Sequence, residues 1–241
     1  MTKVAFVTGG TRGIGRAISA RLAAGDFKVV AGYSGNDEAA KACAESLGVM
    51  VVKGNVSRFE DCRAAIEKVT EELGPVDVLV NNAGITRDVL LHKMTSEQWS
   101  EVIGVNLNSL FNMTRQVIEG MRDRGWGRVI NISSINGQKG QMGQTNYSAA
   151  KAGVIGFTKA LALENGRKGV TVNCIAPGYV DTEMVQAVPE KVLEGIIAQI
   201  PVGRLGRAEE IAEMVAFLAS DQAAFVTGAT ITVNGGHFMA G

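Results

Sequence analysis

The amino-terminal stretch is the feature that most constrains the fold of this chain. A short apolar run over residues 3–8 leads into a loop over residues 9–15 that carries four glycines, and residues 16–23 then show helical periodicity. This order predicts a strand, a glycine-rich loop and a helix. Glycine allows a tight turn and a close backbone approach, so the helix amino terminus can bind an anion such as a pyrophosphate.

The spacing of these glycines narrows the choice of ligand. The pattern from Gly9 to Gly15 is G-x-x-x-G-x-G, which differs from the G-x-G-x-x-G dinucleotide fingerprint. It is not a nucleoside-triphosphate P-loop either, because Arg16 and Ala17 stand where Lys and Ser or Thr are required. A plain strand-to-helix turn is the alternative, but the position directly after the first strand favours a dinucleotide site.

Strands alternate with helices along the rest of the chain. Strands are predicted at 27–33, 49–53, 75–80, 126–132, 170–176 and 230–233, and helices at 60–73, 99–121, 149–167 and 209–219. Near-continuous apolar strands suit a parallel sheet that is covered on both faces. We therefore predict an α/β fold with a doubly wound sheet, as a single dinucleotide-binding and catalytic domain over residues 1–241. A short helical piece at 188–199 lies in the segment 183–206, which we interpret as a substrate lid.

Composition excludes several functional classes. The 241 residues are 46% hydrophobic, and 24 basic residues balance 24 acidic ones, so no net charge favours binding to nucleic acid or to an anionic membrane. Three scattered cysteines lack metal-site spacing and suit buried thiols in a reducing compartment. No signal peptide or apolar run of roughly 20 residues is apparent, so we expect a cytoplasmic protein without a bound metal.

Tyr147 and Lys151 are the leading catalytic candidates. They lie four residues apart, so one helical face can present a phenol and an ammonium to the same small molecule. A phenol titrates near ~10 in water, and a neighbouring cation lowers that pKa. Ser134, thirteen residues before the tyrosine, can hydrogen-bond a substrate carbonyl. The trio can polarise and protonate a carbonyl once a cofactor supplies hydride, although Y-x-x-x-K also occurs by chance on amphipathic helices.

The end of the second predicted strand indicates which nicotinamide cofactor the chain binds. An acidic residue at this position accepts the adenosine ribose hydroxyls, whereas its absence together with nearby cations suits a 2′-phosphate. Here Ser34 follows the strand, and the first acid, Asp37, lies further along. Arg12 in the glycine loop supplies a cation, so NADPH is favoured, although the nearest basic residue after Ser34 is Lys41.

Several short motifs occur together in one order and at characteristic intervals. They are Thr8-Gly9-x-x-x-Gly13-x-Gly15, Asn81-Asn82-Ala83-Gly84, Asn106, Ser134, Tyr147-x-x-x-Lys151 and Pro177-Gly178. The set resembles the short-chain dehydrogenase/reductase family over essentially the whole chain. The resemblance implies a Rossmann fold with seven parallel strands and assembly as a homotetramer.

The resemblance also implies roles for the candidate residues. Tyr147 would be the general acid/base, and Lys151 would hold the nicotinamide ribose and lower the phenol pKa. Ser134 would orient the carbonyl, and Asn106 would support a water-linked proton path. The residues implied to bind the cofactor are Gly9, Thr11, Arg12, Gly13, Ile14, Gly15, Ser34, Asn55, Val56, Asn82, Ala83, Gly84, Tyr147, Lys151, Pro177, Gly178, Val180 and Thr182. Family members usually carry Asp where Asn55 stands, but an amide can also meet an adenine edge.

The segment 135–146 is the part that usually decides the substrate in this family. It resembles the members that reduce acetoacetyl-CoA in polyhydroxybutyrate synthesis, so the implied reaction is NADPH-dependent reduction of a short 3-oxoacyl-CoA to the (R)-3-hydroxyacyl-CoA. By this resemblance Gln141 and Gln144 would contact the acyl group, with Asp88 and Tyr179 nearby. Two amides beside a small pocket suit a short acyl thioester, whereas a long chain would need an apolar wall.

Two alternatives to this function remain open. The 3-oxoacyl-acyl-carrier-protein reductases of fatty acid synthesis resemble the chain almost as well. A sensor that binds NADPH without turnover belongs to another class, and the intact Ser134, Tyr147 and Lys151 argue against it because a sensor does not need them. His92 and His237 are isolated in the sequence and are interpreted as loop or capping residues.

Overall fold

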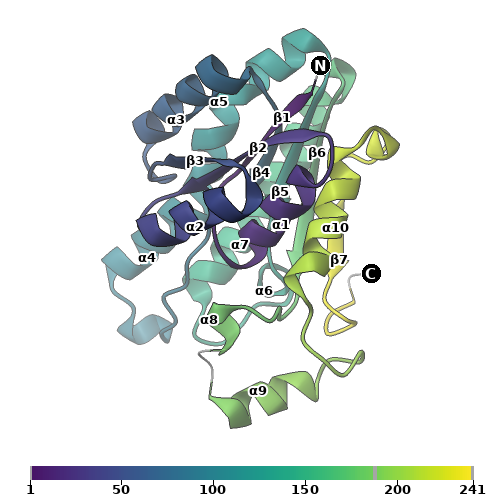
Figure 1. The fold of residues 1–241 in the computed structure, drawn as a ribbon. Helices are drawn as coiled ribbons and strands as arrows, with labels where there is room; N and C mark the ends of the chain where they lie inside the picture. The colour runs from purple at the N-terminus through teal and green to yellow at the C-terminus, as the bar shows by residue number, and fades with distance from the viewer. Residues whose placement is uncertain (1, 187–188, 240–241) are drawn as a thin grey trace.

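A parallel β-sheet runs through the middle of the molecule (Figure 1). The structure is a computed structural model that describes residues 2–186 and 189–239, and within them seven strands join in the order β3-β2-β1-β4-β5-β6-β7. The strands are β1 (Lys3–Val7), β2 (Phe27–Tyr33), β3 (Met50–Lys53), β4 (Val76–Asn81), β5 (Gly127–Ile132), β6 (Val170–Pro177) and β7 (Thr230–Val233). The order reverses between β1 and β4, which confirms the predicted doubly wound α/β fold.

Helices cover both faces of the sheet (Figure 1). One face carries α1 (Gly13–Ala23), α2 (Asp37–Leu47) and α10 (Ala208–Ala219), and the other carries α3 (Phe59–Leu73), α5 (Ser109–Arg124) and α7 (Thr145–Asn165). Shorter helices are α4 (Ser96–Ile103), α6 (Ile135–Lys139), α8 (Glu183–Gln186) and α9 (Glu190–Ile197). In the part of the chain that the structure describes, no helix combines the length and apolar character needed to cross a membrane.

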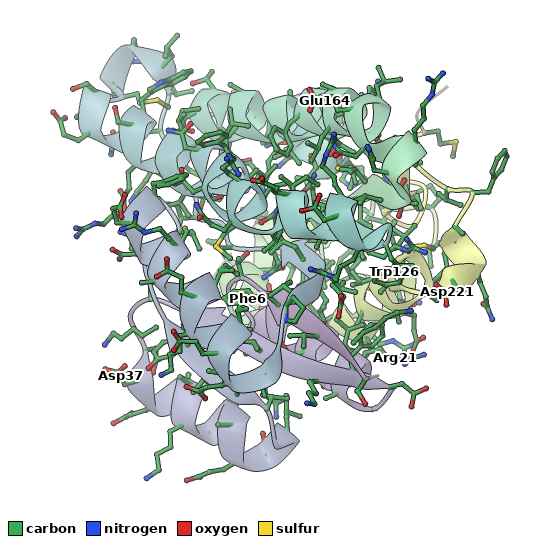
Figure 2. The ribbon with its side chains drawn as sticks, turned by 90° about the horizontal axis from the view of Figure 1, so that it is seen from above. Phe6, Arg21, Asp37, Trp126, Glu164 and Asp221 are labelled. Carbon is green, nitrogen blue, oxygen red and sulfur yellow. The ribbon has the colours of Figure 1, made fainter. Side chains whose placement is uncertain are left out.

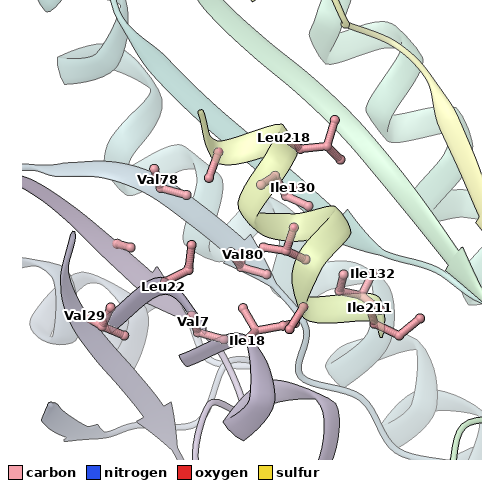
Figure 3. Packing of buried hydrophobic residues seen from close by; sticks show 14 of the residues in the cluster. Val7, Ile18, Leu22, Val29, Val78, Val80, Ile130, Ile132, Ile211 and Leu218 are labelled. Carbon is pink, nitrogen blue, oxygen red and sulfur yellow. The ribbon is translucent and has the colours of Figure 1, made fainter. Parts of the chain in front are cut away.

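The core explains why the strands read as continuous apolar runs. On one face Ile18 and Leu22 of α1 and Ile211 and Leu218 of α10 are buried together against the sheet (Figure 3). The sheet residues in contact with them include Val7, Val78, Val80, Ile130 and Ile132. Their neighbours along the strands, such as Phe6 and Leu79, belong to a second core under α3, α5 and α7. Both faces of each central strand are therefore excluded from water.

Three helical segments differ from the sequence prediction. The helix predicted at 149–167 begins at Thr145, so Tyr147 and Lys151 both lie inside α7. The helix predicted at 99–121 is divided by a π-helical segment, η2 (Gly104–Asn108), that joins α4 to α5. Helix α2 was not predicted, although the Asn36 side chain caps it by accepting a hydrogen bond from the Ala39 N–H at 2.9 Å.

A cluster around Trp126 closes the amino-terminal edge of the sheet (Figure 2). The Trp126 ring contacts two cations, the Lys3 ammonium 3.8 Å from its centroid and the Arg128 guanidinium at 4.3 Å. Its indole N–H donates to Asp221 at 2.8 Å, and Asp221 also pairs with Lys3 and Arg128. Arg128 is only 2% exposed, so this carboxylate is the counter-ion of a buried cation.

Candidate active site

A cavity of about 950 Å³ opens at the opposite, carboxyl-terminal edge of the sheet, next to the point where the strand order reverses. Every residue that the family resemblance implied for cofactor binding lines this cavity, from Gly9 to Thr182. Ser134 lines it as well. The fold thus brings together residues from the loops after six different strands.

The glycine loop fits the phosphates of a dinucleotide. A Cβ on Gly15 would lie 2.0 Å from the Gly9 carbonyl oxygen, so no larger residue is accommodated there. The Thr8 hydroxyl oxygen accepts hydrogen bonds from the N–H groups of Asn82 and Ala83 at 2.9 and 3.0 Å, which ties the loop after β4 to the glycine loop. In the described structure no side chain caps the amino terminus of α1, so its N–H groups are available to an anion.

Helix α7 and the end of β5 bring the catalytic candidates together. Tyr147 and Lys151 lie one helical turn apart, with the Lys151 ammonium 5.6 Å from the centroid of the Tyr147 ring. That ammonium donates to the Ile132 carbonyl oxygen at 2.7 Å. The Ser134 hydroxyl oxygen accepts from the Asn136 N–H at 3.1 Å, which holds the serine in the wall of the cavity.

Burial determines the pKa values of this pair. It raises the pKa of Tyr147 to about 12, an effect that the Ser134 hydroxyl opposes and that Asp88 and Tyr179 reinforce. Burial likewise lowers the pKa of Lys151 to about 8. The lowering of the phenol pKa that was expected from Lys151 is not observed: desolvation of the phenolate is the largest effect and raises the pKa, and the opposing effect comes from Ser134. Tyr147 is therefore protonated at neutral pH and can act as an acid.

Asn106 lies in the π-helical segment and is held by backbone groups. Its side-chain N–H₂ donates to the carbonyl oxygens of Val102 and Ile85, both at 2.9 Å, and its oxygen accepts from the Ile85 N–H at 3.2 Å. Asn106 does not line the cavity itself. It does approach Lys151 behind Gly84, because a Cβ on that glycine would lie 2.7 Å from the Asn106 oxygen and 3.5 Å from the lysine nitrogen.

The two residues predicted to contact the acyl group, Gln141 and Gln144, and the two predicted to lie nearby, Asp88 and Tyr179, differ in their positions relative to the cavity. Gln144 and Tyr179 line the cavity. Asp88 does not line it, but it accepts a hydrogen bond from the Gln144 N–H₂ at 2.8 Å. Gln141 is exposed, and its side chain makes no hydrogen bond within residues 2–186 and 189–239. Sequence reasoning missed Asn136, whose side chain donates to the Gln144 oxygen at 2.9 Å. The only signal for Asn136 in the sequence was its position two residues after Ser134.

His237 also lies closer to the cavity than the sequence indicated. Its ring stacks on Tyr179 with 5.7 Å between centroids and an interplanar angle of 25°, and it lies 3.4 Å from the Lys139 ammonium. Burial and the Lys139 charge lower the pKa of His237. The histidine is thus a neutral support for a cavity-lining tyrosine.

Two buried asparagines connect the strands directly beneath the site. Asn81 of β4 and Asn131 of β5 are paired in register, and the Asn81 side chain donates to the Asn131 oxygen at 2.9 Å. Asn131 in turn donates to the Thr158 hydroxyl of α7 at 2.9 Å. These bonds link two strands to the helix that carries Tyr147.

Comparison with known proteins identifies the family. The model of a family described as enoyl-(acyl carrier protein) reductase, one of the short-chain dehydrogenase/reductases, matches residues 9–237. The chain belongs to the short-chain dehydrogenase/reductase family. The resemblance inferred from the motifs is thereby confirmed, and the chain is an oxidoreductase that uses a nicotinamide cofactor.

Three curated short-chain dehydrogenase/reductases are similar to the chain over almost their whole length. The acetoacetyl-CoA reductase of Rhizobium meliloti is 64% identical over 241 residues, which cover 100% of both chains. The acetoacetyl-CoA reductase of Cupriavidus necator is 54% identical over 242 residues, with 98% of each chain covered. The 3-oxoacyl-acyl-carrier-protein reductase of Escherichia coli is 49% identical over 240 residues, again with 98% covered.

Proposed function

We propose that this protein reduces acetoacetyl-CoA, and other short 3-oxoacyl-CoA thioesters, to the (R)-3-hydroxyacyl-CoA with NADPH, as in polyhydroxybutyrate synthesis. The observation that carries the proposal is one cavity with the glycine loop at one end and Ser134, Tyr147 and Lys151 in its wall. The names of the relatives that are 64% and 54% identical support the choice of substrate.

The side chains account for the proton chemistry of such a reduction. The bound nicotinamide supplies the hydride. Ser134, which the Asn136 N–H holds in the cavity wall, donates its hydroxyl proton in a hydrogen bond to the 3-oxo oxygen. Tyr147 donates its phenolic proton to the same oxygen as the carbonyl is reduced. The Lys151 ammonium, 5.6 Å from the ring, stabilises the resulting phenolate, and Asn106 supports the path that returns a proton.

The surroundings of the adenosine end support NADPH as the cofactor. Arg12 and Ser34 line the cavity there, whereas Asp37, the first acid after β2, does not. A cation and a hydroxyl suit a 2′-phosphate, and a ribose diol would instead need a free carboxylate. The adjacent amide of Asn55 holds a turn by accepting from Ser57, and it still faces the cavity.

Polar groups in the wall support a short acyl chain. The Asp88 carboxylate can only accept, so Gln144 turns its N–H₂ toward it and its oxygen toward Asn136. The second N–H of Gln144 is then available to a substrate carbonyl. A wall of this kind favours a small 3-oxoacyl thioester, because a long alkyl chain would strand these amides without partners.

Reduction of a 3-oxoacyl group on acyl carrier protein is the second candidate, favoured by the 49% identity to the Escherichia coli enzyme. Initial rates with acetoacetyl-CoA and with acetoacetyl-acyl-carrier-protein, each with NADPH and NADH, separate the two. We expect the highest kcat/KM with acetoacetyl-CoA and NADPH. A strong preference for the carrier-protein thioester would contradict the proposal.

The domain organisation and assembly are part of the same proposal. We infer one catalytic domain over residues 1–241 with a lid at 183–206, a segment that includes the undescribed residues 187 and 188. Thr182, Glu183 and Val185 line the cavity, and α9 buries none of its residues, which supports a closing role.

Exposed Phe111 on α5 and Leu163 on α7 support a homotetramer built on these helices. Sedimentation analysis would test it, and a monomer would contradict it.

A further inference from the structure

The carboxylate of Asp37 is held by two neighbouring side chains. The Lys53 ammonium lies 2.9 Å from both of its oxygens, and the Tyr33 hydroxyl donates to one of them at 3.0 Å. The pairing is built into the sheet, because Tyr33 and Lys53 are partners in the register of β2 and β3. Among the ion pairs on α2, this contact is much shorter than the 3.9 Å between Lys41 and Glu45.

This cluster borders the adenosine end of the cavity. Tyr33, Ser34 and Asn36 line the cavity, and Asp37 follows directly as the first residue of α2. Figure 2 shows Asp37 at the periphery of the molecule, and its side chain is 65% exposed. The Asp37 carboxylate therefore lies just outside the cavity and is hydrogen-bonded to Tyr33, which lines it.

A free carboxylate at this place would oppose the proposed cofactor. It would accept hydrogen bonds from ribose hydroxyls and repel a 2′-phosphate. The bonds from Lys53 and Tyr33 hold the pKa of Asp37 below its usual value, and the same contact raises the pKa of Lys53. Both groups thus stay charged, and the pair is neutral as a whole.

We propose that Lys53 is a positioning residue that sets the preference for NADPH by acting through Asp37. It neutralises and retains the carboxylate, which then neither repels the 2′-phosphate nor binds the ribose hydroxyls of NADH. This inference rests on the proposed NADPH preference and on no particular acyl substrate. It can therefore be tested by cofactor binding alone.

The variant Lys53→Met tests the inference in the full-length protein. Titration of NADPH and NADH by nicotinamide fluorescence at low ionic strength gives the two dissociation constants. We expect the Kd for NADPH to rise about threefold to fivefold, the size expected for one exposed charge pair, and the Kd for NADH to stay equal or fall. High salt should shrink the NADPH effect because it screens exposed charges. A Kd ratio equal to that of the wild type would overturn the inference.

Two further variants separate charge neutralisation from other roles. Lys41→Met removes an exposed cation that pairs with Glu45 on the same helix, and it should leave both dissociation constants unchanged. Asp37→Asn combined with Lys53→Met removes the unmasked carboxylate and should restore NADPH binding. If this double variant stays as weak as Lys53→Met, Lys53 does not act through Asp37 and the inference fails.

The wild-type titration distinguishes this inference from the proposed function. Equal Kd values for NADH and NADPH in the wild type would contradict the NADPH preference itself, and the inference with it. A wild-type preference for NADPH that Lys53→Met leaves intact would contradict the role of Lys53 alone.

Discussion

Tyr147 and Lys151 are two titratable groups that burial shifts in opposite directions. The Tyr147 pKa of about 12 keeps the phenol protonated, while the Lys151 pKa of about 8 means that the lysine loses its charge close to physiological pH. The lysine therefore loses its proton first as pH rises. At the residue scale, the protonation of Lys151 rather than of Tyr147 should limit catalysis on the alkaline side.

Removal of the phenolic hydroxyl tests the acid directly. In Tyr147→Phe we expect kcat to fall by about 10²–10⁴, since that is the usual contribution of a positioned general acid. Cofactor affinity should stay close to that of the wild type, because the ring remains in the cavity. Tyr179→Phe is the matched control in the same cavity and should lose far less in kcat. Full activity of Tyr147→Phe, measured by steady-state kinetics, would remove Tyr147 from this role.

The pH profile of ketone reduction tests the lysine. Below pH of about 8 Lys151 is charged and stabilises the phenolate, and above it the amine is neutral and that support is lost. The kcat/KM for reduction should therefore fall as pH rises through about 8, while the buried phenol itself stays protonated. A profile that is flat from pH 7 to about 10 would show that Lys151 does not titrate in this range.

At the element scale, the π-helical segment between α4 and α5 turns Asn106 toward the loop after β4. In Asn106→Ala the Ile85 N–H and two carbonyl oxygens lose their partner. We expect the free energy of unfolding to fall by about 2–4 kcal/mol, because an unsatisfied buried group costs about 1–3 kcal/mol and, of the three groups, only the Val102 carbonyl bond is fully buried while the two Ile85 bonds are part-buried and cost less. Urea titration of both variants would measure this change. Asn112→Ala loses a single bond to the Val56 carbonyl oxygen and should lower the free energy of unfolding by less.

Local sequence signals predicted the strands well and the helix starts less well. Residues 27–33 and 230–233 are strands with the predicted bounds, because apolar runs between turn residues specify them. The start of α7 at Thr145 was missed, since the Gln144 side chain provides no cap; a first-turn N–H, that of Tyr147, is instead bonded to the Asn146 side-chain oxygen at 2.7 Å. Helix α6 spans five residues with a glycine inside, which is too short for a periodic pattern. The signals for α2 were present in Asn36 and Gly48 and were overlooked.

The candidate site could be predicted where its residues belong to sequence motifs. It could not be predicted where the site depends on contacts between residues that are far apart in the sequence. The residues predicted to bind the cofactor line one cavity, because most of them follow strands whose carboxyl ends reach the same edge of the sheet. The hydrogen bond between Asp88 and Gln144 joins residues 56 positions apart, and its geometry depends on loop packing. The contact of Lys53 with Asp37 depends likewise on the register of β2 and β3.

At the scale of the whole molecule, the candidate active-site cavity and the stabilising cluster around Trp126 lie at opposite edges of the sheet. Trp126, Arg128 and Asp221 form a bonded cluster at the amino-terminal edge, and none of the three lines the cavity. Substitutions there should change stability and leave turnover unaffected. This separation follows from a parallel sheet, in which all strands end on the same side.

Asp221→Asn tests this separation. The bonds from Trp126 and Lys3 and the charge of Arg128 lower the pKa of Asp221, so its contribution to stability is present above the unfolded pKa and is lost as pH falls through the folded one. At pH 7 we expect the Tm to drop by about 2–6 °C with kcat unchanged, and the difference to begin to shrink below pH of about 4 and to vanish only once the pH is below the folded-state pKa of Asp221. Asp26→Asn, an exposed site, should leave Tm unchanged. Calorimetry across this pH range would contradict the assignment if the two variants behaved alike.

The buried pair of Asn81 and Asn131 has a consequence for how the strands can align. Successive side chains of a strand face opposite sides, so a slip of one residue between β4 and β5 would place these two amides on different faces and break the hydrogen bond between them. An apolar pair would bury as well in either alignment. The asparagines thus exclude the shifted pairing, and they fix the relative height of the loops that carry Asn82 and Ser134. A chain that lacked them could remain folded and still hold Ser134, the proposed catalytic serine, at the wrong height relative to the loop of Asn82.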